Sequence, residues 1–472
     1  MFLTTFLQIN VAVVGLYIFI VNVVLTSNRN IITKNNSLTY FKYFLVFMLG
    51  YFIVFEYTYF NLVYNMIIFV YLNNLIHKIW YFYIFSIFYI FIGITFVSII
   101  FTVFFYKQEA VFFIFLILMV FLGSQIMWIS NNIFIFFIGY ECLLLPSFLI
   151  LYKHAKTYRC IEAAYAMFFW TQLGSFFILI VVFYFFISYG VSNFTDFAYI
   201  TNFNITDTNM LLFFLLIGFG VKMPIWPFYM WLPKAHVEAS TNFSIFLSGV
   251  LVKLAFLGFL KFLLHINIDF FGWYFYAWML VGICDASQKL FYQTDLKKIV
   301  ALTTVIEMHW VVFTILHTTS LLYYSALMMF ISHALISSLF FILVDCISRR
   351  YKTRNVYDIS GLWVSTPVLN AIILITNIIF LGFPYTSFFL AEFLFFLALI
   401  DINPVIFMIF MLILYFINPI IIFRMWVVVI YGKSWSSAPT AIHDLTKIEL
   451  SIIVFFLFQL IVLGLYPIIN LL

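Results

Sequence analysis

The sequence predicts an all-α polytopic membrane protein with about 14 transmembrane helices, on two observations. Of its 472 residues, 66% are hydrophobic and only 8% are charged, whereas about a quarter of the residues of a soluble domain are charged. The apolar stretches are also long and continuous, close to the roughly 20 residues that cross a bilayer as a helix. They lack the residue-by-residue alternation that is typical of a transmembrane β-barrel.

Polar clusters divide the chain into segments that are each long enough to span a membrane. The expected spans are residues 3–25, 41–72, 79–106, 110–129, 131–152, 161–189, 209–232, 240–263, 270–291, 295–316, 321–345, 366–399, 403–430 and 449–471. The longest polar connection lies around Arg349 to Ser365, which is too short for a soluble domain. The whole chain is therefore expected to lie in or close to the membrane.

The basic residues separate the loops into two sets. Loops after odd-numbered spans carry most of the 22 Lys and Arg residues, whereas loops after even-numbered spans carry only Lys78 and Lys261. By the positive-inside rule we expect the odd-numbered loops to face the cytoplasm or matrix and both termini to face the other side. In a chain of this apolar composition, the net charge of +5 does not indicate a nucleic-acid partner, because the positions of the charges matter more than their sum.

The sequence contains no recognisable targeting segment and no paired cysteines. The first 30 residues lack a basic n-region, a small-residue cleavage site and the Arg-rich character of a mitochondrial presequence. We therefore expect the first apolar run to span the membrane. The cysteines are scattered singly and predict neither a disulfide framework nor an Fe–S site; they are Cys142, Cys160, Cys284 and Cys346.

Two spans carry helix breakers near their centres. Pro224 and Pro227 follow Lys222 in the seventh span, and Gly382 precedes Pro384 in the twelfth. Interrupted helices at matching places in two halves indicate a repeated transporter architecture with a site near the bilayer midplane. The alternative is that the prolines only kink ordinary membrane helices.

Titratable side chains within or beside the spans are the candidate functional residues. A charge at the bilayer centre costs about 2.5–3.5 kcal/mol on insertion scales, so such residues must pair or line a hydrated path. Burial also disfavours the charged form of lysine and of glutamate, so both can exchange protons. The candidates are Glu141, Lys222, His236, Lys253, Glu307, His309, His333 and Glu392.

Each candidate also has an ordinary structural interpretation. Glu141 could form a structural ion pair, and Lys222 could bind carbonyl groups freed by the prolines. His236 could lie at a hydrated helix entry, and the two histidines of later spans could be satisfied core residues. Lys253 lies mid-span in "GVLVKLAFLG", with no kink to serve, so a functional role is favoured there. Glu392 matches that description in the twelfth span.

Nucleotide and metal motifs are absent from the sequence. It contains no GxGxxG, no P-loop and no CxxC, and no His and Cys residues have the spacing of metal ligands. We therefore expect no NADH, flavin or Fe–S cluster to bind to this chain.

Five segments, in order along the chain, resemble the antiporter-like membrane subunits of respiratory complex I, most closely their subunit 4 branch. The similarity covers roughly residues 125–435 and is most specific in 218–262. The segments are "GYECLLLPSFLIL" (139–151), "GFGVKMPIWPFYMWLPKAHVEAS" (218–240), "LSGVLVKLAFLGFLKF" (247–262), "DLKKIVALTTVIEM" (295–308) and "ISHALISSLFFIL" (331–343).

The resemblance implies a proton-pumping subunit in which spans 4–8 and 9–13 form inverted repeats, each with a broken helix. The implied units are three N-terminal helices (1–109), a first repeat (110–263), a second repeat (264–430) and a C-terminal helix (431–472). NADH, FMN, Fe–S clusters and ubiquinone would bind to other subunits. The implied partners are the other complex I membrane subunits, especially neighbouring antiporter-like ones, and lipids such as cardiolipin, with no nucleic acid.

The resemblance also assigns roles to the candidate residues. Glu141 corresponds to the glutamate that partners the lysine of the first broken helix, here Lys222. Lys253 corresponds to a lysine that relays charge along a central polar axis, and Glu392 to the acid on the outlet side. His236 and His333 fall on positions where the family carries histidines of that axis.

This sequence departs from the family pattern at one functional position. The family usually reads "SHM" where this chain reads "IEM", so Glu307 stands in place of a histidine, and His309 follows two residues later. A simple histidine relay between the halves is therefore in doubt. Glu307 could carry the proton instead, or the water chain could have shifted.

The N-terminal sequence and the composition indicate the membrane in which the chain lies. The missing presequence and the 67 Phe and 31 Tyr residues, typical of an AT-rich coding genome, favour the mitochondrial inner membrane, with basic loops in the matrix and both termini in the intermembrane space. A bacterial inner membrane is the other location.

Two alternative functions remain open from the sequence: a stand-alone cation/proton antiporter and a purely structural scaffold. A scaffold would tolerate neutral replacement of every mid-span charge.

Overall fold

The structure, a computed structural model, describes residues 110–153, 157–199, 205–265, 273–316, 320–431 and 443–471, with isolated positions between 91 and 99. This part of the chain is helical and contains no β-strand, only two isolated bridges. The first three expected spans and the unit 1–109 lie almost wholly outside the described residues. The total of about 14 helices therefore stays a prediction.

The first half of the described chain contains five consecutive membrane-length segments, some of them divided. Its elements are α4 (Ala110–Ile129), α5 (Ile133–Cys142), α6 (Leu144–Lys153), α7 (Tyr158–Tyr189), η2 (Phe194–Tyr199), α8 (Ile205–Lys222), η3 (Phe228–Met230), α9 (Trp231–Glu238), α10 (Thr241–Phe246), the π-helix η4 (Leu247–Leu251) and α11 (Val252–His265).

The second half follows the same order of long, divided and π-containing segments, and a C-terminal helix follows it. Its elements are α12 (Trp273–Phe291), α13 (Leu296–Ile315), α14 (Ser320–Tyr351), η5 (Val356–Asp358), α15 (Leu362–Ser365), α16 (Pro367–Phe380), α17 (Ser387–Ile402), α18 (Pro404–Met411), the π-helix η6 (Leu412–Ile417), α19 (Asn418–Tyr431) and α20 (Lys447–Leu471).

Helix boundaries follow local capping chemistry. The side chain of Asn132 accepts hydrogen bonds from the first turn of α5, and that of Asp295 does so for α13. Such caps satisfy amide groups that have no partner within the helix. At its C-terminus, α7 ends on Gly190, whose left-handed conformation (φ 66°) suits glycine.

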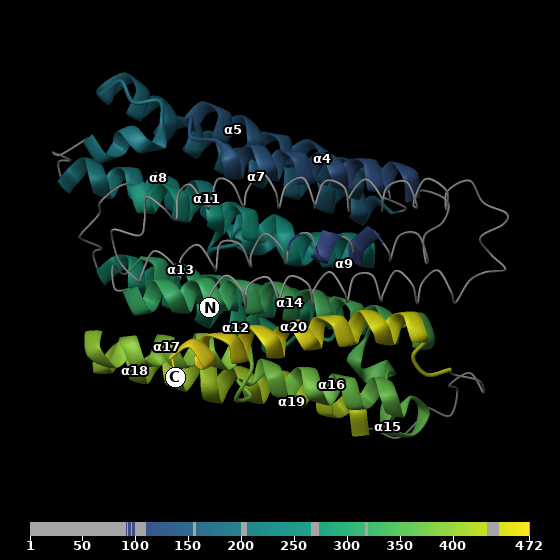
Figure 1. The fold of residues 1–472 in the computed structure, drawn as a ribbon. Helices are drawn as coiled ribbons and strands as arrows, with labels where there is room; N and C mark the ends of the chain where they lie inside the picture. The colour runs from purple at the N-terminus through teal and green to yellow at the C-terminus, as the bar shows by residue number, and fades with distance from the viewer. Residues whose placement is uncertain are drawn as a thin grey trace.

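Six of the described helical segments are long and apolar enough to cross a membrane. Three of them are almost entirely buried within the chain, over 94–100% of an apolar stretch of 18 residues: Thr241–Leu263, Leu296–Ile315 and Leu321–Tyr351. The other three are only 39–50% buried and form the outside of the bundle. In Figure 1, α4, α5 and α7 lie at one edge, α13 and α14 in the middle, and α16 to α19 at the opposite edge.

The two predicted interruptions are present. In the seventh span, α8 ends at Lys222 and regular helix resumes only at Trp231, after the short turn η3. In the twelfth span, α16 ends at Phe380 and α17 begins at Ser387. Each broken pair packs beside an unbroken 32-residue helix, α8 and α9 beside α7, and α16 and α17 beside α14.

Each half also contains an isolated β-bridge between two loops. Asn132, before α5, pairs with Asn193, after α7; Asp295, before α13, pairs with Asn355, after α14. In both bridges the first residue of the helix donates its N–H to a carbonyl of the distant loop, and that loop donates an N–H back, at 2.8–3.0 Å. Both bridges thus fasten a capped helix start to the end of the long helix of the same half.

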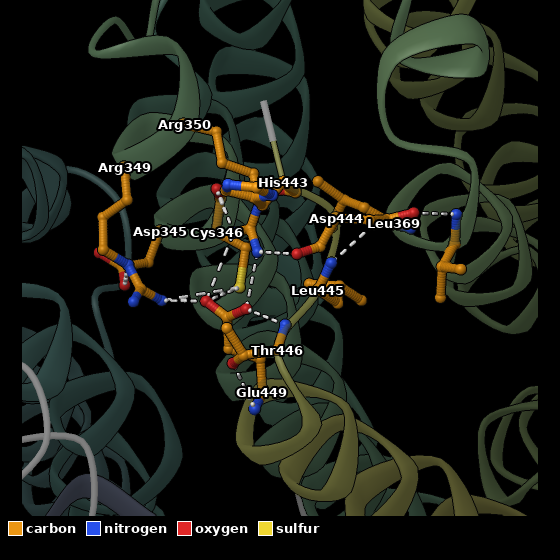
Figure 2. Close-up of polar contacts among 11 residues, drawn as sticks. Asp345, Cys346, Arg349, Arg350, Leu369, His443, Asp444, Leu445, Thr446 and Glu449 are labelled. Carbon is orange, nitrogen blue, oxygen red and sulfur yellow. Dashed lines mark hydrogen bonds and ion pairs between the residues drawn. The ribbon is translucent and has the colours of Figure 1, made fainter. Parts of the chain in front are cut away.

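A polar cluster ties α20 to the end of α14 (Figure 2). The carboxylate of Glu449, which is almost fully buried, lies 2.9 Å from the guanidinium of Arg349 and 2.7 Å from that of Arg350. Arg350 also donates to the backbone carbonyls of His443 and Asp444. The carboxylate of Asp444 in turn accepts two amide hydrogen bonds from the first turn of α16. The segment 443–449 therefore joins three helix ends.

Candidate functional site

The break in the seventh span opens directly after Lys222. Pro224 and Pro227 have no backbone N–H and disfavour a continuing helix. The backbone therefore turns, and the peptide bond between Trp226 and Pro227 is cis. Since unsatisfied backbone groups are costly inside a membrane, the break requires partners from elsewhere in the chain.

Side chains supply those partners. The N–H of Trp226 donates to Nε2 of His309 at 2.7 Å, and its carbonyl accepts from Nε1 of Trp278 at 2.7 Å. The carbonyl of Val221 accepts from Nε1 of Trp231 at 2.8 Å. Two of these partners belong to α12 and α13, so helices of the second half hold the break of the first half.

Lys222 binds to Tyr140 in this structure and forms no ion pair with Glu141. Its ammonium donates to the backbone carbonyl of Tyr140 at 3.2 Å and lies 3.5 Å from the centre of the Tyr140 ring, a cation–π contact. Oε1 of Glu141 is buried and has no hydrogen-bond partner. The two charges are nevertheless close enough for direct Coulombic interaction, so the pairing of Glu141 with Lys222 stays a prediction.

Lys253 is fully buried and joins the two halves. Its Nζ lies 2.8 Å from Nδ1 of His333 on α14 and 2.6 Å from the carbonyl oxygen of Ser248. Ser248 belongs to the π-helix η4, which directly precedes α11. The expectation that Lys253 serves no helix irregularity was therefore wrong. The wider π turn changes the backbone pairing, and the Ser248 carbonyl binds the lysine.

His236 is fully buried on α9 and stacks on the ring of Phe341 from α14, with ring centroids 4.4 Å apart. Neither ring nitrogen of His236 has a hydrogen-bond partner. Buried imidazole nitrogens are normally paired with protein groups or with water. Burial argues against the hydrated helix entry considered from the sequence, and the unpaired nitrogens make His236 a candidate for water-mediated proton transfer.

The carboxyl group of Glu307 interacts electrostatically with both Lys253 and Glu392. It is buried on α13 with 7% exposure, and it is close enough to both residues for direct Coulombic interaction. Two carboxyl groups that share a buried site do not readily ionise together. Through its charge interactions Glu307 therefore links a lysine on α11 to a second carboxyl group on α17.

Glu392 lies against the break in the twelfth span. A Cβ atom on Gly382, which adopts φ +78°, would come within 2.5 Å of Oε2 of Glu392. The same oxygen accepts a hydrogen bond of 2.8 Å from the hydroxyl of Tyr415, which belongs to the π-helix η6. A titratable residue thus lies beside a π-helix in each half, Lys253 in the first and Glu392 in the second.

His309 differs from the other candidates because both of its ring nitrogens are engaged by backbone groups. Nε2 receives the Trp226 N–H, and Nδ1 lies 2.8 Å from the carbonyl oxygen of Val305. His309 matches the satisfied core histidine that the sequence left open.

Several contacts of the site were missed by the sequence reasoning. No role at the site was assigned to Tyr140 or Tyr415 from the sequence. Asp285 and Lys289, four residues apart on α12, bind to the hydroxyl of Tyr229 in the first break, at 2.5 and 2.8 Å. The sequence contained a signal for the contact with Tyr229, because Asp285 and Lys289 are two opposite charges four residues apart in a largely apolar helix.

Metal and thiol chemistry have no visible site in the described part of the chain. Within it, no group of three or more His, Cys, Asp or Glu side chains could hold a metal ion. The four cysteines, all within the described ranges, are free thiols.

Comparison with known sequences identifies related proteins. A family model described as NADH:quinone oxidoreductase/Mrp antiporter, TM, matches residues 130–418. The chain is 36% identical over 326 residues to NADH-ubiquinone oxidoreductase chain 4 of Paramecium tetraurelia, covering 68% of both chains. It is 34% identical over 289 residues to the protein of the same name from Acanthamoeba castellanii, covering 59% of this chain and 58% of that relative.

Solved structures share the fold at lower identity. A chain of the Mrp complex from Dietzia sp. DQ12-45-1b superposes with a TM-score of 0.72 at 16% identity, covering 82% of this chain and 81% of that chain. A chain of respiratory complex I from Thermus thermophilus superposes with a TM-score of 0.64 at 20% identity, covering 76% and 81%.

Proposed function

This chain belongs to the NADH:quinone oxidoreductase/Mrp antiporter transmembrane family, and from this membership we propose that it is a proton-translocating membrane subunit of an NADH:quinone oxidoreductase complex. Its relatives of chain 4 type suggest the mitochondrial inner membrane as its location. Electron transfer takes place on other subunits, and this chain moves protons through its buried titratable side chains.

The contact between Lys253 and His333 is the observation that carries the proposal. Both side chains are buried and lie 2.8 Å apart, with Lys253 on α11 of the first half and His333 on α14 of the second. An ammonium and a neutral imidazole can share one proton through such a bond. A lysine with only a packing role would not require a contact between its amino group and the imidazole of His333 at the junction of the two halves.

The proton path that these positions support runs across the chain, parallel to the membrane. It begins at Glu141 and Lys222, whose mutual distance sets the proton affinity of the lysine. It continues through Lys253, with His236 and His333 as neighbouring bases. It then passes to Glu307 and to Glu392 beside the second break, from where the proton leaves on the face with few basic residues.

We further propose that spans 4–8 and 9–13 are inverted repeats, with the units 110–263 and 264–430. The bridge between Asn132 and Asn193 has its counterpart in the bridge between Asp295 and Asn355. Each joins the start of the second helix of a unit to the loop after its third helix. Since the first bridge follows an even-numbered span and the second an odd-numbered one, they belong on opposite faces of the membrane.

Partners follow from the same function. A subunit of this type associates with the other membrane subunits of the complex, especially neighbouring antiporter-like ones, and with lipids such as cardiolipin. The likeness to the Mrp complex is one of fold, at 16% identity, whereas the named relatives above 30% identity are NADH dehydrogenase subunits. A stand-alone sodium/proton antiporter is therefore the less favoured function.

Purification under mild detergent tests the proposal. We expect this chain to co-purify with NADH:quinone reductase activity in a particle far larger than 55.8 kDa, and the reconstituted particle to pump protons only with NADH and quinone, with or without sodium. Recovery as a small particle that exchanges sodium for protons in the absence of NADH would overturn it.

A further inference from the structure

The unwound segment Trp226–Met230 is held from one side by α12. The residues of α12 that face it are spaced at three or four positions and so share one face of that helix. They are Trp278, which binds the Trp226 carbonyl; Gly282, which lies against the Trp226 side chain; Asp285, which accepts from the Tyr229 hydroxyl; and Lys289, which donates to the same hydroxyl and to Sδ of Met230.

His309 reaches the same segment from α13. Gly282 leaves room for it, because a Cβ atom on Gly282 would collide with Nε2 of the imidazole. The ring also packs edge-on against Tyr229, at 6.4 Å between centroids. Its Nε2 meets the Trp226 N–H, which Pro224 and Pro227 have left outside any helix.

The partners of His309 determine its tautomer. The backbone N–H of Trp226 can only donate, so Nε2 must be the unprotonated acceptor. The carbonyl of Val305 can only accept, so Nδ1 must carry the proton. Uptake of a proton at Nε2 would break the bond to Trp226, and loss of the proton from Nδ1 would break the bond to Val305. His309 therefore cannot pass a proton while it holds the break.

We propose that His309 is a positioning residue and no part of the proton path: it fixes the unwound segment, and thereby the nearby end of α8 at Lys222. This rests on the proposed function of Lys222. Trp278 on α12 also fixes this segment, because its indole N–H, which does not titrate, donates to the Trp226 carbonyl. Because α12 and α13 belong to the second half, they couple the geometry of the first break to that half independently of the contact between Lys253 and His333.

Substitutions in the assembled complex separate positioning from proton transfer. His309→Gln keeps an acceptor near Nε2 but cannot relay a proton, whereas His309→Ala removes the acceptor. We expect His309→Gln to pump close to the parental number of protons per NADH, and His309→Ala and Trp278→Phe to pump fewer. Since a purely structural defect would lower the amount of complex, the ratio is measured on equal amounts of assembled complex.

The outcomes that overturn the inference are specific to it. If His309→Gln lost pumping as completely as His309→Ala, His309 would be a proton carrier. If Trp278→Phe pumped like the parent, holding the segment from α12 would not matter. Lys253→Met serves as the reference, because normal pumping by that variant would refute the proposed function itself and leave the positioning role of His309 to be judged by the other three variants.

Discussion

Nζ of Lys253 lies 2.8 Å from Nδ1 of His333, and both side chains are excluded from solvent. The remaining contact of the lysine is the Ser248 carbonyl, which the π-helix η4 turns towards it. One charge is thus stabilised by a neutral base and a backbone dipole, without a carboxylate in direct contact. Such an arrangement can gain and lose a proton more readily than a buried salt bridge, in which each charge fixes the other.

Replacement of Glu307 tests its place between Lys253 and Glu392. We predict that Glu307→Gln greatly slows proton translocation, because the amide cannot accept the proton that Lys253 releases. Glu307→His should retain translocation, since imidazole is titratable and the resemblance described from the sequence implies a histidine at this position. Proton uptake by reconstituted complex, driven by NADH, measures both variants. Parental activity of Glu307→Gln would exclude the carboxyl group from the path.

Gly382→Ala should impair the second break more than Gly190→Ala impairs the end of α7. Both glycines have positive φ, so each substitution carries a backbone cost of about 1–2 kcal/mol. At Gly382 the new methyl group would also crowd Oε2 of Glu392, whereas a Cβ on Gly190 meets nothing within 4 Å. The pumping rate of the two variants is the measurement; equal rates would show that contact with Gly382 is unimportant for Glu392.

Glu449→Gln should destabilise the complex, because it leaves Arg349 and Arg350 without their shared carboxylate. We expect about 3 kcal/mol, the lower end for a broken buried pair, since the Arg349 side chain is 29% exposed. Glu162→Gln is the control. It breaks an exposed pair with Lys234, worth about 1 kcal/mol or less. Thermal inactivation compares the two, and equal midpoints would contradict the structural role of the cluster.

Local sequence patterns predicted some helix ends and the two breaks, but not the division of the expected span 131–152 into α5 and α6. The span expected at 110–129 is α4, since the end of an apolar run there coincides with the end of the helix. Pro224 and Pro227 predicted the first break because they remove backbone donors, and Gly382 with Pro384 predicted the second, where the structure gives Gly382 a positive φ.

Non-local contacts could not be predicted in the same way. Neither π-helix has a proline or a charge within it, and the contact between Lys253 and His333 depends on how α10 and η4 pack against α14. Likewise, Glu141 was the evident partner for Lys222 by charge, but the structure presents the Tyr140 carbonyl and ring to the ammonium. Which side chain meets a buried charge depends on tertiary geometry that residue type alone does not specify.

Proton stoichiometry of Lys253→Met most directly tests the claim that buried side chains of this chain carry protons. Methionine is similar in length and apolar, so it fills the space of the lysine without its titratable group. We predict that the assembled complex with Lys253→Met translocates fewer protons per NADH oxidised than the parent. Parental stoichiometry at the parental rate, in a fully assembled complex, would contradict a relay through Lys253 and His333.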